Sequence, residues 1–395
     1  MTYDVAIVGL GATGAAAAYQ LAKRGARVLA FDQFSPPHTF GSSHGETRIT
    51  RLAIGEGDHL TPFAIRSHEI WRDIEQETGT SLLATIGGLV ISSEMTVAET
   101  HVKGFFRNTL AAAKKFGIPH ELLDAGQIRK RFPQFRVQGD EVGYFEPSAG
   151  YLRPEECIRA QLALAKHYGA DVRTEDTVYA FEPASDIVKI RTAAGEHAAA
   201  QLILAAGPWL PRLLDPKLAD LFKVYRQIML WFEVTGEIGA FKPPHFPIFI
   251  WELRDEQQGI YGFPLIGSPS EGMKFASEQF QSSTDPEGVD RTVSDAEIAA
   301  YVRLVVPHLP GVGPRCLKAA TCLYTVTPDF GFVLDKHPES DRVIIASPCS
   351  GHGFKHSAAI GEALAEMILD GASRLDLGPL RLSRFHGAQK TKPAE

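Results

Sequence analysis

Residues 5–14 read Val-Ala-Ile-Val-Gly-Leu-Gly-Ala-Thr-Gly, an apolar run that leads into a Gly-x-Gly-x-x-Gly pattern at Gly9, Gly11 and Gly14. An alanine-rich stretch follows, and then a second apolar run that ends at Asp32. Strand, helix and strand in this order predict a βαβ unit at the start of the chain. The first glycine permits a tight turn, the second lets a pyrophosphate approach the backbone, and the third allows the helix to pack closely on the strand.

Asp32 follows the glycines at the spacing at which a carboxylate accepts hydrogen bonds from a ribose. The pattern therefore predicts dinucleotide binding, with a purely structural turn as the alternative. It is compatible with NAD or FAD, whereas the carboxylate would repel the 2′-phosphate of NADP. The residues expected to contact the dinucleotide here are Gly9, Gly11, Ala12, Thr13, Gly14, Asp32 and Gln33.

The composition is that of a globular protein. The chain has 395 residues, of which 44% are hydrophobic and 22% charged, so about two or three domains are expected. A net charge of −7 argues against nucleic acid as a partner. The four cysteines include no C-x-x-C pair, which favours a cytoplasmic protein without a metal site. No apolar run reaches the roughly 20 residues that span a bilayer, so we expect no membrane association.

Two arginines follow the dinucleotide unit. Residues 40–51 read Phe-Gly-Ser-Ser-His-Gly-Glu-Thr-Arg-Ile-Thr-Arg and place Arg48 and Arg51 in or beside a loop rich in glycine and serine. Guanidinium groups in such a loop can bind a carboxylate through two parallel hydrogen bonds. Two exposed surface arginines are the alternative.

This loop closely resembles the corresponding loop of monomeric sarcosine oxidases and their relatives, the N-methyltryptophan and pipecolate oxidases. Further blocks resemble the same family, occur in the family's order and span nearly the whole chain. They are Phe145-Glu-Pro-Ser-Ala-Gly150, Tyr225-Arg-Gln227, Gly259-Ile-Tyr-Gly-Phe-Pro264, Cys322-Leu-Tyr-Thr-Val-Thr-Pro-Asp329 and Ser350-Gly-His-Gly-Phe-Lys355. The resemblance discriminates between the cofactors and implies FAD.

The resemblance also implies the fold class, which is α/β, or α+β over the whole chain. A Rossmann-like FAD-binding domain is expected to be interleaved with a substrate domain built on a mixed antiparallel sheet. The expected FAD-binding domain consists of residues 1–85, 145–222 and 315–385, and the substrate domain of 86–144 and 223–314. Residues 386–395 are expected to form a flexible tail.

Cys322 alone would be interpreted as a buried structural cysteine. In the family, the cysteine of the matching block holds the flavin through a thioether to its 8α carbon, so the resemblance implies covalent FAD at Cys322. The other cofactor contacts that it implies are Ser42, Ser43, His44, Arg48, Thr50, Val178, Ala206, Gly207, Trp209, Tyr324, Gly351, Gly353, Phe354 and Lys355.

The family also implies roles for substrate-binding residues. Arg51 and Lys355 match the two cations that hold the substrate carboxylate, and holding it orients the C–H bond next to nitrogen over the flavin. Arg48 is expected near the flavin, where it would polarise the site. Tyr261 and Tyr324 match tyrosines in or near the substrate pocket, although aromatic residues in strands can equally serve packing.

Two further residues bear on the reaction. Lys274 matches a lysine that in the family lies over the flavin and activates dioxygen, since a cation stabilises the negative charge that develops there. An exposed strand lysine is the alternative. Four residues later the sarcosine oxidases carry a histidine, but this chain has Glu278. A carboxylate can pair with a cationic substrate or accept hydroxyl hydrogen bonds, and fructosyl amino acid oxidases are similar in having an acid at that spacing.

The expected function is therefore FAD-dependent oxidation of a secondary amine or an N-methyl amino acid. Hydride transfer to the flavin would be followed by reoxidation with O2, which gives H2O2. The alternatives are a fructosyl amino acid or pipecolate-type oxidase, a flavin amine dehydrogenase, an NAD-dependent dehydrogenase and a non-catalytic FAD-binding scaffold. The expected partners are a small-molecule amine and O2, and we expect a monomer or a weak homodimer.

Overall fold

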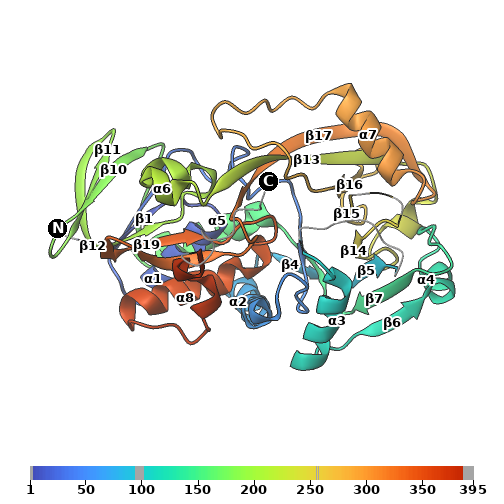
Figure 1. Ribbon diagram of the computed structural model, residues 1–395, viewed down its shortest axis with the longest axis horizontal. Coiled ribbons are helices and arrows are strands. Elements are labelled where there is room, and N and C mark those ends of the chain that lie inside the picture. The colour runs from blue at the N-terminus through green and yellow to red at the C-terminus, as the bar shows by residue number, and fades with distance from the viewer. Residues whose placement is uncertain (1–2, 94–101, 255, 257, 386–395) are drawn as a thin grey trace, which may run out of the picture.

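The computed structural model describes residues 3–93, 102–254, 256 and 258–385. The chain forms two lobes side by side, each built on its own eight-stranded sheet (Figure 1). The tail predicted at 386–395 lies outside the described residues.

The N-terminal pattern forms the predicted βαβ unit in the first sheet. Strand β1 (Tyr3–Val8) pairs in parallel with β2 (Val28–Asp32) on one side and with β12 (Gly195–Leu204) on the other. The parallel part continues with β9 (Asp171–Thr174) beside β2 and β19 (Ser340–Ser347) beside β12. The apolar residues of β1 and β2 are buried, as expected for parallel strands covered by other layers. The predicted Rossmann-like sheet is confirmed.

Antiparallel strands extend this sheet. Strands β10 (Val178–Pro183) and β11 (Val188–Thr192) pair antiparallel with each other, and β11 pairs with β12. Strand β18 (Val333–His337) pairs antiparallel with β19.

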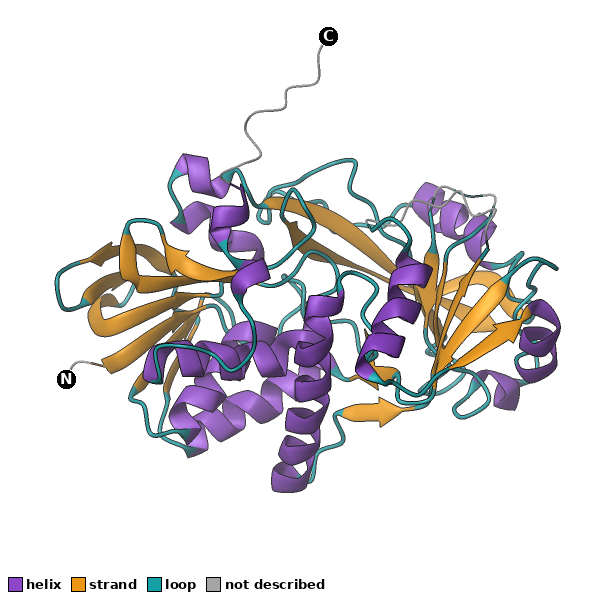
Figure 2. Cartoon of the chain, turned by 60° about the horizontal axis from the view of Figure 1, so that its bottom comes forward, coloured by secondary structure: helices purple, strands orange, loops and turns teal. Residues whose placement is uncertain are grey.

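A group of helices lies below the first sheet in the view of Figure 2. Helix α1 (Ala12–Lys23) packs against both α5 (Pro154–His167) and α8 (Ser357–Leu369), and α2 (Thr61–Thr78) packs against α8. The contact between α1 and α8 is close, because a Cβ added at Gly361 would lie 2.4 Å from the Cβ of Ala16. The alanine-rich sequence therefore serves close helix packing next to the glycine motif.

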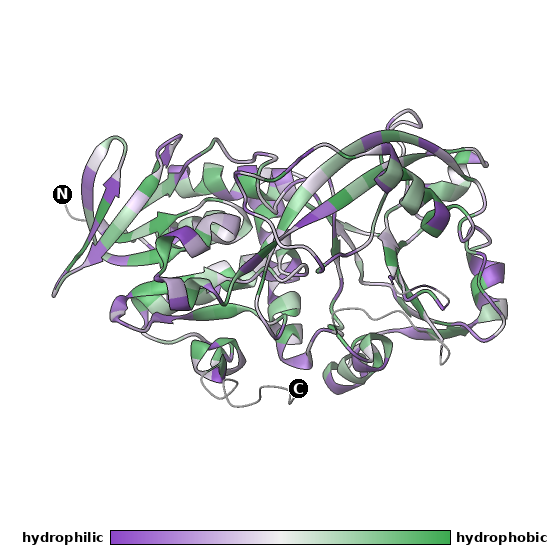
Figure 3. Cartoon of the chain, turned by 45° about the horizontal axis from the view of Figure 1, so that its top comes forward, coloured by the Kyte–Doolittle hydropathy of each residue, from purple (hydrophilic) through white to green (hydrophobic). Residues whose placement is uncertain are grey.

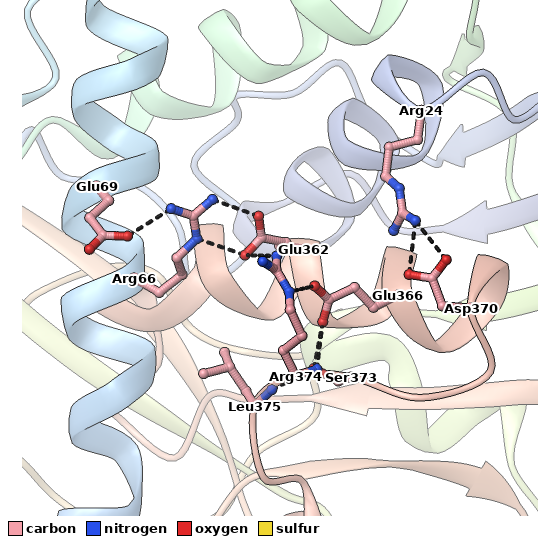
Figure 4. Close-up of polar contacts among 9 residues, drawn as sticks. All are labelled: Arg24, Arg66, Glu69, Glu362, Glu366, Asp370, Ser373, Arg374 and Leu375. Atoms are coloured by element: carbon pink, nitrogen blue, oxygen red, sulfur yellow. Dashed lines mark hydrogen bonds and ion pairs between the residues drawn. The ribbon is translucent and has the colours of Figure 1, made fainter.

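The outer face of α8 carries a network of ion pairs (Figure 4). Arg66 of α2 donates to both carboxylate oxygens of Glu362, at 2.8 and 2.7 Å. The Glu366 carboxylate accepts hydrogen bonds from Ser373 Oγ and from the backbone N–H of Arg374, each at 2.9 Å. This network joins α2, α8 and the segment after α8, and such partly exposed pairs each contribute about 1 kcal/mol or less.

The second sheet is antiparallel except for one parallel pair, between β5 and β14. Its strands, in spatial order, are β17 (Val312–Val326), β13 (Lys223–Val234), β16 (Met273–Ala276), β15 (Ile260–Gly262), β14 (Ile248–Trp251), β5 (Gly88–Ser92), β7 (Val142–Glu146) and β6 (Glu121–Asp124). Strands β13 and β17 carry both hydrophilic and hydrophobic residues (Figure 3).

The core of the second lobe is aromatic and includes Phe135, Phe232, Phe249, Trp251 and Phe275. Helices α3 (Phe105–Phe116), α4 (Ala125–Arg131) and α7 (Asp295–Val305) lie in this lobe. Helices α4 and α7 each begin with a capping box, at Asp124 and Ser294 respectively, which satisfies the free N–H groups of the first turn.

A three-stranded sheet of β3 (Arg48–Thr50), β8 (Gly150–Leu152) and β4 (Leu83–Thr85) completes the strands. The short helices are η1 (Asp58–Leu60), η2 (Gly207–Leu213), α6 (Pro216–Ala219), η3 (Ile238–Phe241), η4 (Phe354–His356), η5 (Gly378–Leu380) and η6 (Leu382–Phe385).

The chain enters the second sheet at β5, leaves it after β7 and returns to it from β13 to β17. The boundary predicted at 315 falls inside β17, and the one predicted at 145 falls inside β7. The domain boundaries remain predictions. Among the described residues, no helix is both long and apolar enough to cross a bilayer.

Candidate functional site

One cavity of about 490 Å³ brings most of the predicted site residues together. Its walls come from the βαβ unit, from the loop before β3, from the second sheet and from η4. The predicted residues that line it are Gly9, Gly11, Ala12, Thr13, Asp32, Gln33, Ser42, Ser43, Arg48, Arg51, Val178, Ala206, Gly207, Trp209, Tyr261, Lys274, Glu278, Tyr324, Gly351, Gly353, Phe354 and Lys355.

Four predicted residues lie outside this lining: Gly14, His44, Thr50 and Cys322. Gly14 packs on the backbone of Gly9, because a Cβ there would lie 1.8 Å from the Gly9 carbonyl oxygen. Cys322 is 2% exposed and packs in one cluster with Met229 and Tyr324, which both line the cavity. The cysteine therefore lies beside the cavity.

The turn between β1 and α1 forms one end of the cavity. Gly9 has φ +91°, and a Cβ there would lie 2.5 Å from the carbonyl oxygen of Ala205, so only glycine fits. Helix α1 has no side-chain cap at Gly11, and the N–H of Ala12 donates only a long hydrogen bond to Ser43 Oγ at 3.3 Å. An uncapped helix N-terminus that faces a cavity suits a phosphate group.

Asp32 lies at the end of β2 and lines the same part of the cavity. Its two carboxylate oxygens accept hydrogen bonds from the backbone N–H groups of Leu10 and Phe34, each at 2.8 Å. Burial raises the pKa of Asp32, and these two N–H groups oppose that rise. Each oxygen keeps a lone pair that a ribose hydroxyl can use.

Several buried polar atoms on residues that line the cavity have no partner within the described part of the chain. They include Trp209 Nε1, Ser347 Oγ and Thr47 Oγ1. Buried polar atoms are normally hydrogen-bonded, so these atoms indicate that a polar ligand belongs here. Together with the uncapped helix and Asp32, they fit a dinucleotide.

A buried cluster of charges lies on another wall. Arg51 is 2% exposed and pairs with Glu56 at 2.5 Å, and Lys355 Nζ donates to the other oxygen of Glu56 at 2.9 Å. Lys355 also donates to the carbonyl oxygen of His352 at 3.0 Å. Burial lowers the pKa of Lys355, and Glu56 opposes that fall. One carboxylate of the protein thus already bridges the two cations predicted to bind the carboxylate of a substrate.

Lys274 of β16 forms a second buried cation. It is 4% exposed, so it is not a surface lysine, and Nζ donates to the carbonyl oxygens of Gly45 at 2.7 Å and Thr47 at 2.6 Å. Nζ lies 4.2 Å from the ring centre of Phe263. Burial holds the pKa of Lys274 well below its usual value, and the neighbouring Arg48 lowers it further. The third ammonium hydrogen has no acceptor among the described residues, and Lys274 lines the cavity.

Arg48 lies close to Lys274 and is held by backbone oxygens. Its guanidinium donates to the carbonyl oxygens of Ser42 at 2.8 Å and Thr47 at 2.9 Å. Two cations thus meet at one loop of the cavity wall, where they raise the local positive potential.

Tyr261, Tyr324 and Glu278 share one part of the lining. The hydroxyl oxygens of Tyr261 and Tyr324 lie 3.1 Å apart, and burial raises the pKa of both. Glu278 Oε1 reaches over Gly351, since a Cβ there would lie 3.2 Å from that oxygen and 2.9 Å from the ring of Tyr324. The predicted carboxylate is therefore part of the cavity wall beside the tyrosine pair.

No group of three or more metal-ligating side chains occurs within the described ranges. The structure also adds residues for which the sequence predicted no role, above all Glu56 and Glu155. Glu56 lies between two glycines shortly after the arginine loop, and only this position in the sequence could have indicated that it belongs to the site. Glu155 had none, because its partner loop lies far away in the sequence.

Comparison with known proteins agrees with this geometry. The family of FAD dependent oxidoreductases matches residues 4–367. This chain belongs to that family.

The most similar relatives include a monomeric sarcosine oxidase of Streptomyces avermitilis, 40% identical over 97% of this chain and 98% of the relative. An N-methyl-L-tryptophan oxidase of Yersinia pestis is 32% identical over 98% of this chain and 100% of its own length. Among solved structures, NikD, an amino acid oxidase of nikkomycin biosynthesis, aligns with a TM-score of 0.81 at 25% identity, covering 96% of this chain and 97% of NikD.

Proposed function

We propose that this protein is an FAD-dependent oxidase of a secondary amine or an N-methyl amino acid and that it releases H2O2. The observation that carries the proposal is the placement of two kinds of cation on one dinucleotide-type cavity. Arg51 and Lys355 form a pair suited to a carboxylate, and Lys274 stands apart from them with one N–H that has no acceptor in the described part of the chain. The substrates of the relatives, sarcosine and N-methyl-L-tryptophan, support the same class of substrate.

The residues of the first lobe would hold FAD. The start of α1 at Gly11 and Ala12 would face the pyrophosphate, Asp32 would accept hydrogen bonds from a ribose, and the Trp209 indole would gain a partner. When bound, FAD accepts two electrons from the amine and passes them to dioxygen. Arg48, fixed by two backbone oxygens, polarises the site.

We propose that the flavin is covalently held by a thioether between Cys322 Sγ and its 8α carbon. The support is the family's cysteine block and the packing of Cys322 against cavity residues. The colour of a denatured, washed protein pellet tests this proposal. Yellow flavin should stay with the wild-type pellet and leave the Cys322→Ser pellet, with Cys316→Ser as the matched control. Release from both the wild type and the control would contradict the linkage.

In the substrate site, the substrate carboxylate competes with Glu56 for Arg51 and Lys355. Once it is held there, the carbon next to the amine nitrogen is fixed relative to Tyr261 and Tyr324. The amine must be neutral before it can donate electrons. The Glu278 carboxylate, on the same wall, can accept a hydrogen bond from the amine or from a hydroxyl group of the substrate.

Glu278 supports a second candidate, a fructosyl amino acid-type oxidase. A carboxylate in the cavity wall favours a cationic or hydroxylated substrate over small and uncharged N-alkyl groups. The two candidates share the carboxylate site and differ only in the group that Glu278 faces.

A peroxidase-coupled assay in air tests both candidates. The panel consists of sarcosine, N-methyltryptophan, pipecolate, proline and a fructosyl amino acid. Peroxide from any member supports an amine oxidase, and the preferred member shows which candidate holds. Flavin bleaching without peroxide would instead indicate a dehydrogenase.

We further propose a cytoplasmic location and a monomeric or weakly dimeric state. The support is that none of the four cysteines, all of which lie in described segments, forms a disulfide, as is usual in a reducing compartment. Size-exclusion chromatography with light scattering at several concentrations tests the oligomeric state, and a stable higher oligomer would contradict it.

A further inference from the structure

The loop of residues 44–47 connects a carboxylate of the first lobe to the buried lysine of the second sheet. Gly45 and Glu46 both adopt the left-handed conformation, with φ +97° and +70°. A non-glycine residue in this conformation is uncommon and persists only when its surroundings hold it there. A Cβ at Gly45 would lie 2.7 Å from Met229 Sδ, so this position needs glycine.

This conformation points the N–H groups of the loop to one side and its carbonyl oxygens to the other. The N–H of Gly45 donates to Glu155 Oε1 at 2.6 Å, and the N–H of Glu46 donates to the same carboxylate at 3.1 and 3.2 Å. On the other side, the carbonyl oxygens of Gly45 and Thr47 accept from Lys274 Nζ.

One peptide group therefore links the two charges. The N–H of Glu46 and the carbonyl of Gly45 belong to the same peptide, so the Glu155 carboxylate, this peptide and the Lys274 ammonium form a continuous hydrogen-bonded chain. Each charge polarises the peptide in the direction that strengthens the other hydrogen bond.

Glu155 forms no direct ion pair with any described residue, and its hydrogen bonds there are those to the two loop N–H groups. Glu46, the other nearby carboxylate, already pairs with Lys318 on β17 and accepts from Trp231 Nε1 at 2.9 Å. The charged and titratable groups that face Lys274 are Arg48 of β3, His44 and Glu46 of the loop, Glu155 of α5 and Cys322 of β17, with Lys318 across the Trp231 ring.

We propose that Glu155 is a positioning residue for Lys274: through the Gly45–Glu46 peptide it fixes the lysine and keeps it in the ammonium form in which it can assist the reaction with dioxygen. The inference rests on the proposed function, because it presumes that Lys274 serves the oxygen reaction. It assigns a role to a carboxylate that does not line the cavity.

The test compares Glu155→Gln with Glu156→Gln in the holoenzyme. Glu156 is the next residue on α5 and pairs with Arg159, so its substitution removes the same charge without touching the loop. Two quantities are measured from pH 6 to 10: the protonation of Lys274 from its 15Nζ resonance, assigned by its loss in Lys274→Met, and the rate of flavin reoxidation by O2 after anaerobic reduction.

In Glu155→Gln we expect the midpoint of Lys274 protonation to fall by about one pH unit or more, since an opposite charge at short range shifts a pKa by roughly that amount. Reoxidation should slow near pH 8 and recover at lower pH, while Glu156→Gln behaves like the wild type. In a Lys274→Met background, Glu155→Gln should have no further effect on reoxidation. An unchanged midpoint, or an equal loss at every pH, would overturn the proposal.

Two further variants keep the test decisive. If Glu155→Gln does not hold flavin, Glu155→Asp, which keeps the charge, replaces it, and Glu46→Gln, which removes a nearby carboxylate that pairs with Lys318, serves as its control. The midpoint should stay near the wild-type value in Glu155→Asp, and a fall there at least as large as in Glu46→Gln would count against the proposal. If Lys274→Met itself reoxidises normally, the proposed role of Lys274 fails; if it is slow and Glu155→Gln is not, only the present inference fails.

Discussion

Lys355 and Lys274 are both buried in the wall of one cavity, at 5% and 4% exposure, but their surroundings differ. Lys355 makes a direct ion pair with Glu56 at 2.9 Å, whereas Lys274 contacts two backbone carbonyls, and Glu155 stands one peptide group away. Burial lowers the pKa of both lysines, but Glu56 opposes the fall directly at Lys355.

The difference in surroundings indicates that the two lysines have different roles. A lysine with a carboxylate already on it is arranged to hold a carboxylate, because the geometry that suits Glu56 also suits a substrate. A lysine held by neutral carbonyls, with no carboxylate directly on it, keeps an ammonium N–H that can stabilise negative charge when it develops nearby. The two lysines thus divide binding from the oxygen reaction.

The largest effect is expected from Lys274→Met. It should lower kcat/KM for O2 by about 100-fold or more, because it removes the cation from the developing charge. Oxygen consumption at saturating amine and varied O2 measures this. Lys318→Met is the matched control, since that partly exposed lysine lies on the same Trp231 ring, 4.6 Å from its centre. Equal losses of kcat/KM for O2 in the two variants would contradict a specific role of Lys274 in the reaction with O2.

Lys355→Met should act on binding. Loss of one charged hydrogen bond is expected to weaken the binding of a small carboxylate that lacks an amine by about 10- to 100-fold. Titration of the flavin absorbance with that carboxylate gives the dissociation constant. Lys355→Arg keeps the charge and should lose less. An unchanged dissociation constant in Lys355→Met would show that Lys355 does not bind the substrate carboxylate.

Glu278→Gln should change the choice of substrate. The loss of its charge is expected to reduce kcat/KM for a substrate that carries hydroxyl groups or a second cationic group by about 10-fold, while sarcosine changes little. The ratio of the two kcat/KM values in the peroxide assay is the relevant quantity. A ratio equal to that of the wild type would show that Glu278 does not face the substrate.

The smallest effect concerns His356, which stands next to Lys355. It is fully buried, and neither ring nitrogen has a partner in the described structure, so burial and Lys355 hold its pKa well below 6.5. Below pH 6.5 the unfolded chain therefore binds a proton that the folded protein does not. The free energy of unfolding consequently decreases as the pH is lowered. His356→Phe should raise Tm by about 2 °C at pH 5 and by less at pH 8. A gain of the same size at both pH values would contradict this assignment.

The sequence predicted the parts of the site that depend on local pattern. The glycine turn, the uncapped start of α1 and Asp32 follow from one continuous stretch, and the strands around it are apolar enough to be recognised. Lys274 and Lys355 were found only because short blocks around them resemble a known family.

The carboxylates that act on these lysines were not predicted, for physical reasons. Glu155 reaches Lys274 through a loop more than 100 positions away in sequence, and the left-handed conformation at Glu46 has no sequence pattern of its own. The strand register that stacks Lys318, Trp231 and Lys274 across β17, β13 and β16 likewise depends on long-range pairing. Such contacts appear only when the fold is known.

The division of labour between the two lysines is tested most directly by stopped-flow measurement of the two half-reactions, with the best amine of the panel. We predict that Lys274→Met reduces its flavin at nearly the wild-type rate and reoxidises it about 100-fold more slowly. Lys355→Met should need far more amine for reduction and reoxidise normally. Both half-reactions slowed alike in both variants would contradict the account.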